Sequence, residues 1–404
     1  MVQKRKRRSR IDPRKLTVLI LSVIVIMFIS IWCYGIVSRT IENFLKNNHV
    51  GGFTGVFTKP IYPKKPELDK GEYDLRMSYL AHKFNFNDAT STALFKEALK
   101  FSNASTTVAT STVASTTSTT TKVLTKKIVS DLWPAKGTAY PKVGAILPFK
   151  RVVAYYGNLY SKKMGILGEY ESDEVLRRLQ AQVKEWEIAD PATPVQPALH
   201  YIAVVAQGAA GKDGKYRTRM PDEQIDRVLE MAKKINAIVF LDIQVALSDV
   251  QHEVPALEKY LILPNVHLGI DPEFSMKTGK KPGSVIGSMD ASDINYTASY
   301  LADLVKKNDL PPKILVFYRF TRNMVTNYKN IKTLPETQLV LAMDGWGHQA
   351  RKVGTYNAFV NPEPIQFAGF KLFYKNDLKQ DNSRLMTPSE VLKLTPSPIY
   401  IQYQ

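Results

Sequence analysis

The stretches AIVFLDIQV (residues 237–245) and NVHLGIDPEF (265–274) decide the fold class of this 404-residue chain. Both are short apolar runs that are rich in branched side chains, which is typical of buried strands. The segment before the first run, PDEQIDRVLEMAKKIN (221–236), has the apolar spacing of an amphipathic helix. Strands that alternate with helices predict a parallel sheet, because parallel neighbours need a crossover connection between them.

The same pattern continues in both directions along the chain. The other expected strands are RVVAYYG (151–157), ALHYIAVVA (198–206), SVIGSMD (284–290), KILVFYRF (313–320), QLVLAMDG (338–345) and FAGFKLFY (367–374). Two further helices are expected at 172–187 and 293–308. Eight strands with helices over about 250 residues predict an α/β fold of the (β/α)8 TIM-barrel type. An open doubly wound sheet is the alternative, but no glycine-rich dinucleotide loop follows the first strand.

The N-terminal part of the chain predicts a membrane anchor. Residues 16–37, LTVLILSVIVIMFISIWCYGIV, carry no charge, and roughly 20 apolar residues are enough for a transmembrane helix. Residues 1–15 are strongly basic, and such segments stay on the cytoplasmic side. We therefore expect a single-pass protein of the cytoplasmic membrane, with its N-terminus inside and its barrel domain extracytoplasmic. A cleaved signal peptide and a lipidated Cys33 are alternatives, which the bulky Trp32 and Tyr34 disfavour.

Composition divides the remaining chain into three parts. Residues 38–100 form a membrane-proximal region with one expected helix at 88–101, DATSTALFKEALKF. Residues 101–122 are nearly all Ser, Thr, Ala and Val, which predicts a low-complexity linker that buries too little to order itself. The barrel domain is expected over 124–404. It contains no disulfide, because Cys33 is the only cysteine.

The charge balance narrows the choice of partners. The formal net charge is +18, of which about +7 lies in the basic N-terminal segment and serves topology. The rest suits contact with an anionic surface such as a cell-wall polymer or lipid headgroups, or is simply a lysine-rich solvated surface. The sequence carries no zinc-finger, helix-turn-helix or RNA-binding signature, so no nucleic-acid partner is expected. No cofactor and no metal are expected either.

Acidic residues collect at the ends of the predicted strands, where barrel enzymes carry their active sites. Asp271 and Glu273 end the 265–274 strand on either side of Pro272. Neighbouring carboxylates repel, so one of them should keep its proton to higher pH. A protonated acid beside an ionised partner is the arrangement used in glycoside hydrolysis, and we expect Asp271 and Glu273 to be catalytic.

Two other interpretations of these carboxylates remain open. They could form a structural ion-pair network with Lys371, or they could join Asp242 and Asp290 around a metal ion. His267 lies deeper on the same strand and is expected to be a core residue. The expected substrate-binding residues, taken from the strand ends and their aromatic neighbours, are Tyr155, Tyr156, Asp242, Gln244, Asp290, Arg319, Asp344, Trp346, Lys371 and Tyr374.

The D-x-E ending of the 265–274 strand resembles the catalytic end of chitinase-like and muramidase-like glycosidase barrels. By that resemblance Glu273 would be the proton donor and Asp271 its neighbouring carboxylate. The longer chitinase pattern D-x-x-D-x-D-x-E is not kept, because Gly269 and Val266 occupy the earlier acidic positions. That departure sets the chain apart from the chitinases themselves.

The C-terminal region also resembles a family of secreted or membrane-anchored bacterial proteins with AYYG, MGxLGE and FAGFKLFY segments. That resemblance implies a place in the bacterial cell envelope. We therefore expect a membrane-anchored, glycoside hydrolase-like enzyme that acts on cell-wall or extracellular polysaccharide. The alternative is a catalytically inactive barrel that binds a glycan or an envelope protein.

Overall fold

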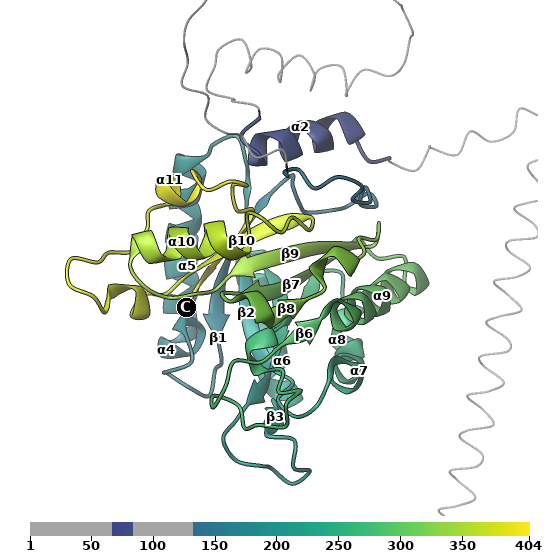
Figure 1. Ribbon diagram of the computed structural model, residues 1–404, viewed down its shortest axis with the longest axis vertical. Coiled ribbons are helices and arrows are strands. Elements are labelled where there is room, and N and C mark those ends of the chain that lie inside the picture. The colour runs from purple at the N-terminus through teal and green to yellow at the C-terminus, as the bar shows by residue number, and fades with distance from the viewer. Residues whose placement is uncertain (1–66, 84–131) are drawn as a thin grey trace, which may run out of the picture. The chain divides into compact units, whose positions relative to one another are not determined.

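The computed structural model describes residues 67–83 and 132–404, which belong to one compact unit (Figure 1). The predicted membrane span 16–37, the helix expected at 88–101 and the linker 101–122 lie outside the described residues. In the part of the chain that is described, no helix is long and apolar enough to cross a membrane.

A closed barrel of eight parallel strands forms the centre of the described chain. Each strand pairs with the next around the ring, and β1 closes it by pairing with both β2 and β11. This pairing confirms the predicted (β/α)8 barrel. The barrel strands are β1 Arg151–Gly157, β2 Val195–Ala206, β4 Ile238–Ile243, β5 Val266–Ile270, β7 Lys313–Arg319, β9 Thr337–Met343, β10 Phe367–Leu372 and β11 Tyr400–Tyr403. A short strand β3, Arg217–Arg219, adds to β2 in the antiparallel direction.

One of the eight predicted strands lies outside the barrel, and one strand of the barrel was not predicted. Residues 284–290 do not enter the barrel; only β6, Met289–Asp290, is a strand, and it pairs with β8, Val325–Thr326, in a separate small sheet. The backbone before β6 instead packs on the end of β5, where the Gly287 amide donates to the Glu273 carbonyl. The barrel is completed by β11, whose four residues at the C-terminus are too short a run to stand out in the sequence.

Helices cover the outside of the barrel. The long ones are α5 Ser172–Ala189, α6 Asp222–Lys234, α9 Ala291–Lys307 and α10 Gln349–Phe359, and the first three confirm the sequence prediction. In α5 the side chains of Val175, Leu179 and Trp186 are buried in the layer between strands and helices, as expected for an amphipathic helix. The short helices are α4 Ile166–Glu169, α7 Val250–Glu253, α8 Glu258–Leu261 and α11 Pro388–Val391, and the 3-10 turns are η1 Pro255–Leu257, η2 Pro272–Phe274, η3 Arg322–Met324, η4 Tyr328–Asn330 and η5 Asn376–Leu378.

A second hydrophobic cluster fills the interior of the barrel at the N-terminal ends of its strands. The helix α2, Lys70–Leu80, contributes Tyr73, Met77 and Leu80 to this cluster. Its last turn is fixed by a hydrogen bond from the Tyr79 hydroxyl to Asp190 at 3.0 Å. Residues 67–83 therefore close the bottom of the barrel, although they fall within the predicted membrane-proximal region.

Candidate active site

A layer of polar side chains crosses the barrel interior above the apolar cluster. Nε2 of His200 lies 3.0 Å from Oδ1 of Asp242, and Nδ1 of His200 lies 2.6 Å from the Tyr400 hydroxyl. The Tyr156 hydroxyl donates to Oδ2 of Asp242 at 3.0 Å, and the Gln402 amide donates to the Tyr400 hydroxyl at 2.8 Å. Burial lowers the pKa of His200, so its imidazole is neutral and the layer is held by hydrogen bonds.

Gly269 on β5 leaves the space that this polar layer needs. It pairs in register with Asp242 on β4. A Cβ atom at position 269 would lie 2.2 Å from Oδ1 of Asp242 and 2.5 Å from Nε2 of His200. The space beside the Gly269 backbone is thus filled by the buried His200–Asp242 pair.

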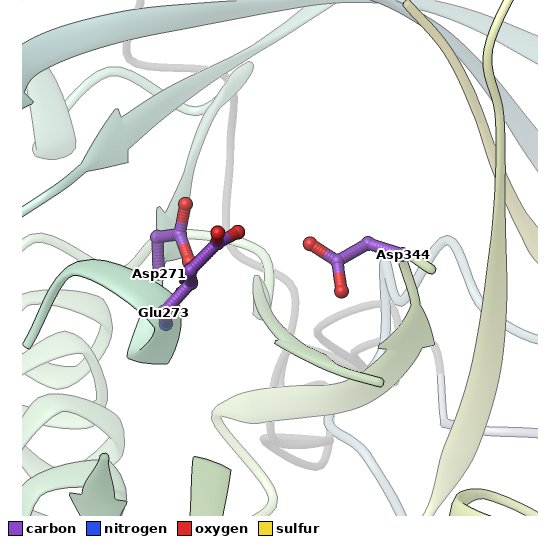
Figure 2. A group of neighbouring side chains, drawn as sticks. All are labelled: Asp271, Glu273 and Asp344. Carbon is purple, nitrogen blue, oxygen red and sulfur yellow. Dashed lines mark hydrogen bonds between the residues drawn. The ribbon is translucent and has the colours of Figure 1, made fainter. Parts of the chain in front are cut away.

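Three carboxylates converge above the polar layer, at the C-terminal ends of the strands (Figure 2). Asp271 ends β5 and caps η2, and its Oδ1 accepts the Glu273 amide at 3.0 Å. Asp344 follows β9 and reaches toward this pair from the other side (Figure 2). One oxygen from each of Asp271, Glu273 and Asp344 lies within 4.8 Å of the others. The turn after β5 therefore presents Glu273 to the same space as Asp344.

Burial dominates the electrostatics of this cluster. It raises the pKa of Asp271 well above the usual range, and the charges of Asp242 and Glu273 raise it further. Burial also raises the pKa of Glu273 and lifts that of Asp344 to about 7. The Lys371 ammonium opposes burial by lowering the pKa of all three carboxyl groups. Near neutral pH the cluster thus keeps a transferable proton, while Lys371 stabilises an ionised neighbour.

The cluster opens into a cavity of about 550 Å³, a size typical of small-ligand sites. Seven of the residues predicted from the sequence line this one cavity: Tyr156, Gln244, Asp271, Glu273, Asp344, Trp346 and Lys371. Trp346 is 44 % exposed at the rim of the cavity, and the cationic groups of Arg351 and Lys379 lie over its ring. Gln244 donates to Asp271 at 3.4 Å and accepts the Ala206 amide at 3.0 Å, so it braces the acid from β4.

Five of the predicted residues lie outside the lining of this cavity. Asp242 is fully buried in the polar layer below it. Tyr155 faces the opposite side of β1 from Tyr156, because successive side chains of a strand point to opposite faces, and it meets Tyr374, with 3.1 Å between the hydroxyls. Arg319 forms a buried ion pair with Glu363. Asp290 caps α9 by accepting the Ser292 amide at 3.0 Å.

His267 is a core residue, as expected. It is buried against Phe240, and its Nδ1 accepts the Ile314 amide at 3.1 Å.

Other residues of the site were not predicted from the sequence. His200, Tyr318 and Tyr400 form the polar layer, but a single buried histidine or tyrosine in a strand resembles ordinary core. Gln402 and Gln404 belong to β11 and its end, and were missed with that strand. The other cavity residues were not singled out from the sequence, although several lie within predicted strands; they are Lys163, Met164, Ile202, Ala206, Phe274, Ile286, Phe320, Thr321, Gly345, Arg351, Thr355 and Phe373.

Asp271, Glu273 and Asp344 are also the described residues best placed to hold a metal ion. Carboxylate oxygens at such spacing suit Ca²⁺ or Mg²⁺. However, Asp271 already accepts hydrogen bonds from Gln244 and the Glu273 amide. The Lys371 charge and the retained protons offset the remaining repulsion, so the cluster fits proton transfer without an ion.

No family model matches the sequence. No curated protein matches it either, so the resemblance to secreted bacterial proteins stays a prediction. Two solved structures of Bacillus subtilis mannanases are similar to the chain. For the mannanase BCman the TM-score is 0.33 at 12 % identity, over 64 % of this chain and 81 % of that chain. For the mannanase man26 the TM-score is 0.32 at 12 % identity, over 63 % and 79 %. The barrel assignment rests on the strand pairing and not on these similarities.

Proposed function

We propose that this protein is a glycoside hydrolase that works by carboxylate acid–base catalysis. The observation that carries the proposal is the convergence of Asp271, Glu273 and Asp344 at the C-terminal end of the barrel, with oxygens within 4.8 Å of one another. Hydrolysis of a glycosidic bond needs one carboxylic acid that gives a proton and one carboxylate that remains ionised. Burial raises the pKa of Glu273, which favours a retained proton. Asp344, whose pKa burial raises to about 7 against the lowering effect of Lys371, is ionised above that pH.

The geometry suggests a role for each carboxyl group. Glu273 gives its proton to the oxygen of the leaving sugar, since its side chain is only partly buried and lines the cavity. Asp344, from the opposite side, stabilises the positive charge that develops on the sugar carbon as its bond to the leaving oxygen breaks; a water molecule then adds to that carbon and returns a proton to Glu273. Asp271 is a positioning residue, because its oxygens hold the Glu273 backbone and Gln244.

If the barrel were catalytically inactive, Glu273 would be expected to form an ion pair with a neighbouring cation. Among the described residues, the ion pair of Arg319 is with Glu363, and the Lys371 ammonium lies over the ring of Tyr156 at 3.9 Å from its centroid. Glu273 thus remains available in the cavity. This arrangement favours the enzyme over the binding protein.

The test is incubation of the full-length protein, in a mild detergent, with purified peptidoglycan and a panel of polysaccharides, with products detected by mass spectrometry. We expect new reducing ends with the wild type and a loss of roughly 10²–10⁴-fold in rate for Glu273→Gln, as for a removed general acid. Glu187→Gln on the exposed face of α5 is the matched control. Full turnover by Glu273→Gln would remove Glu273 from this role.

We also propose that residues 16–37 anchor the protein in the cytoplasmic membrane, with the barrel outside. The uncharged run and its basic flank support this topology. The substrate would then be a cell-wall or extracellular polysaccharide. Fractionation should recover the intact chain with the membranes, whereas recovery from the medium of protein that begins after residue 38 would contradict the anchor.

A further inference from the structure

The wall of the cavity carries two cations that have no acidic partner within the described part of the chain. Lys163, between β1 and α4, and Arg351, on α10, both line the cavity that holds the three carboxylates. Neither forms an ion pair with any acid in residues 67–83 or 132–404. Other surface cations nearby are paired: Arg177 and Arg178 with Glu174, and Lys375 with Glu169. The charges of Lys163 and Arg351 therefore border the cavity without an ion-pair partner among the described residues.

Arg351 occupies a position that is electrostatically unfavourable for the fold alone. It lies in the first turn of α10, where the positive end of the helix dipole disfavours a cation. Its guanidinium is held over the ring of Trp346, 5.3 Å from the centroid. Its stem packs on Gly347, where an added Cβ would lie 2.8 Å from Cδ of Arg351. The loop between β9 and α10 therefore keeps this cation on the cavity wall, beside the aromatic rim.

The floor of the same cavity needs hydrogen-bond donors. Asp344 is 7 % exposed, and its Oδ1 is buried with no hydrogen-bond partner among the described residues. A buried acceptor without a partner is costly, and a sugar hydroxyl is a suitable donor. The Asp344 carboxylate on the cavity floor can therefore accept a hydrogen bond from a sugar hydroxyl, while Lys163 and Arg351 on the cavity wall can bind a negatively charged group.

We infer that the substrate is a carboxylated glycan, one whose sugar carries a carboxylate that Arg351 and Lys163 bind while its hydroxyl groups reach Asp344. This inference rests on the proposed hydrolase function and names its substrate class. Arg binds carboxylates through two parallel hydrogen bonds. A monoanionic carboxylate also suffers less repulsion from the acidic floor than a dianionic phosphate, because the Coulomb energy scales with the charge.

The test measures binding apart from turnover. Full-length Glu273→Gln is titrated calorimetrically with tetragalacturonate and with the same oligosaccharide after its carboxyl groups have been reduced to alcohols. We expect the acidic form to bind at least about tenfold more tightly at low salt, with the difference shrinking as salt is added. Equal affinity for the two forms would overturn the inference, and so would tighter binding of a sulfated oligosaccharide of the same length.

Matched variants test whether Lys163 and Arg351 cause the preference for the acidic oligosaccharide. In the Glu273→Gln background, Lys163→Gln with Arg351→Gln should abolish the preference for the acidic form. Lys307→Gln with Lys329→Gln removes the same charge from exposed positions away from the cavity and should preserve it. If acidic oligosaccharides bind as expected but the wild type releases no product from peptidoglycan or from any polysaccharide of the panel, the hydrolase proposal fails while the ligand class stands. If the preference survives the loss of Lys163 and Arg351, the inference fails and the hydrolase proposal stands.

Discussion

The ammonium group of Lys371 lies 3.9 Å from the centroid of the Tyr156 ring. The Tyr156 hydroxyl in turn donates to the buried Asp242 at 3.0 Å, so the polar layer of the barrel fixes the ring on which the cation rests. An aromatic face stabilises a desolvated cation without neutralising it. Lys371 therefore lowers the pKa of Asp271, Glu273 and Asp344 while none of these acids is bound to it in an ion pair.

Lys371→Met should move the pH–rate profile to higher pH. The cation lowers the pKa of the three carboxyl groups, so its removal raises those values, and the ionised carboxylate forms only at higher pH. An opposite charge at this range shifts a pKa by about one to three, and the acid limb should move by a comparable amount. Lys371→Arg keeps the charge and is the matched control. Carbon-13 NMR titration of the carboxyl groups checks the same shift without a substrate, and an unchanged titration would contradict the role of Lys371.

Asp344→Asn should stabilise the fold at alkaline pH and not at acidic pH. The folded-state pKa of Asp344 is raised to about 7, above the unfolded value of about 3.9. Its contribution to stability is therefore fully present below about pH 4 and is lost as the pH rises through 7. At pH 8 the variant should exceed the wild type in free energy of unfolding by at most roughly 4 kcal/mol.

Denaturant unfolding of both proteins at pH 4 and pH 8 measures this difference. Asp303→Asn, on the exposed face of α9, is the control and should show no such dependence on pH. A constant difference between Asp344→Asn and the wild type at the two pH values would show that Asp344 keeps an ordinary pKa.

Gly269→Ala should destabilise the barrel, whereas Gly354→Ala should not. The added methyl group at position 269 would lie 2.2 Å from Oδ1 of Asp242, and overpacking of this kind costs about 1–3 kcal/mol. Gly354 lies within α10, where a Cβ would meet nothing within 4 Å, so alanine should stabilise by roughly 0.5–1 kcal/mol. Urea unfolding of the two variants measures both effects. Equal stability of Gly269→Ala and the wild type would mean that His200 and Asp242 can shift apart.

The carboxylate cluster could be predicted because it depends only on strand ends. Asp271 and Asp344 each follow an apolar run, and in a barrel the C-terminal ends of all strands meet at one mouth. That rule holds regardless of which strands are neighbours. The rule therefore included Asp344 among the expected site residues, although its strand β9 is separated from β5 by β7 in the ring.

The direction of individual side chains could not be predicted in the same way. Tyr155 and Tyr156 are adjacent, so one must face the barrel interior and the other the helices. Both faces of a barrel strand are buried, and both of these side chains are. No alternation of polar and apolar residues therefore tells the two faces apart. For the same reason the sequence prediction assigned Arg319 to the substrate site. In the structure its guanidinium is paired with Glu363 outside the cavity.

Met77→Ala should destabilise the barrel, although residue 77 lies far along the chain from the first barrel strand. Its side chain is 4 % exposed and belongs to the cluster inside the barrel, with Val152, Phe240 and Val316. Truncation of a buried methionine to alanine costs roughly 2–5 kcal/mol. Ser78→Ala, one position along α2, is the control and should change the free energy of unfolding by less than about 0.5 kcal/mol.

A pair of fragments tests the same contact in a second way. Residues 67–404 retain α2 and should unfold in one cooperative transition. Residues 124–404 lack it, which uncovers the apolar lower end of the barrel, so this fragment should unfold at lower denaturant and bind a hydrophobic dye. Equal stability of the two fragments would mean that α2 adds nothing to the barrel core, and that the barrel domain begins after residue 123, where the change in composition places it.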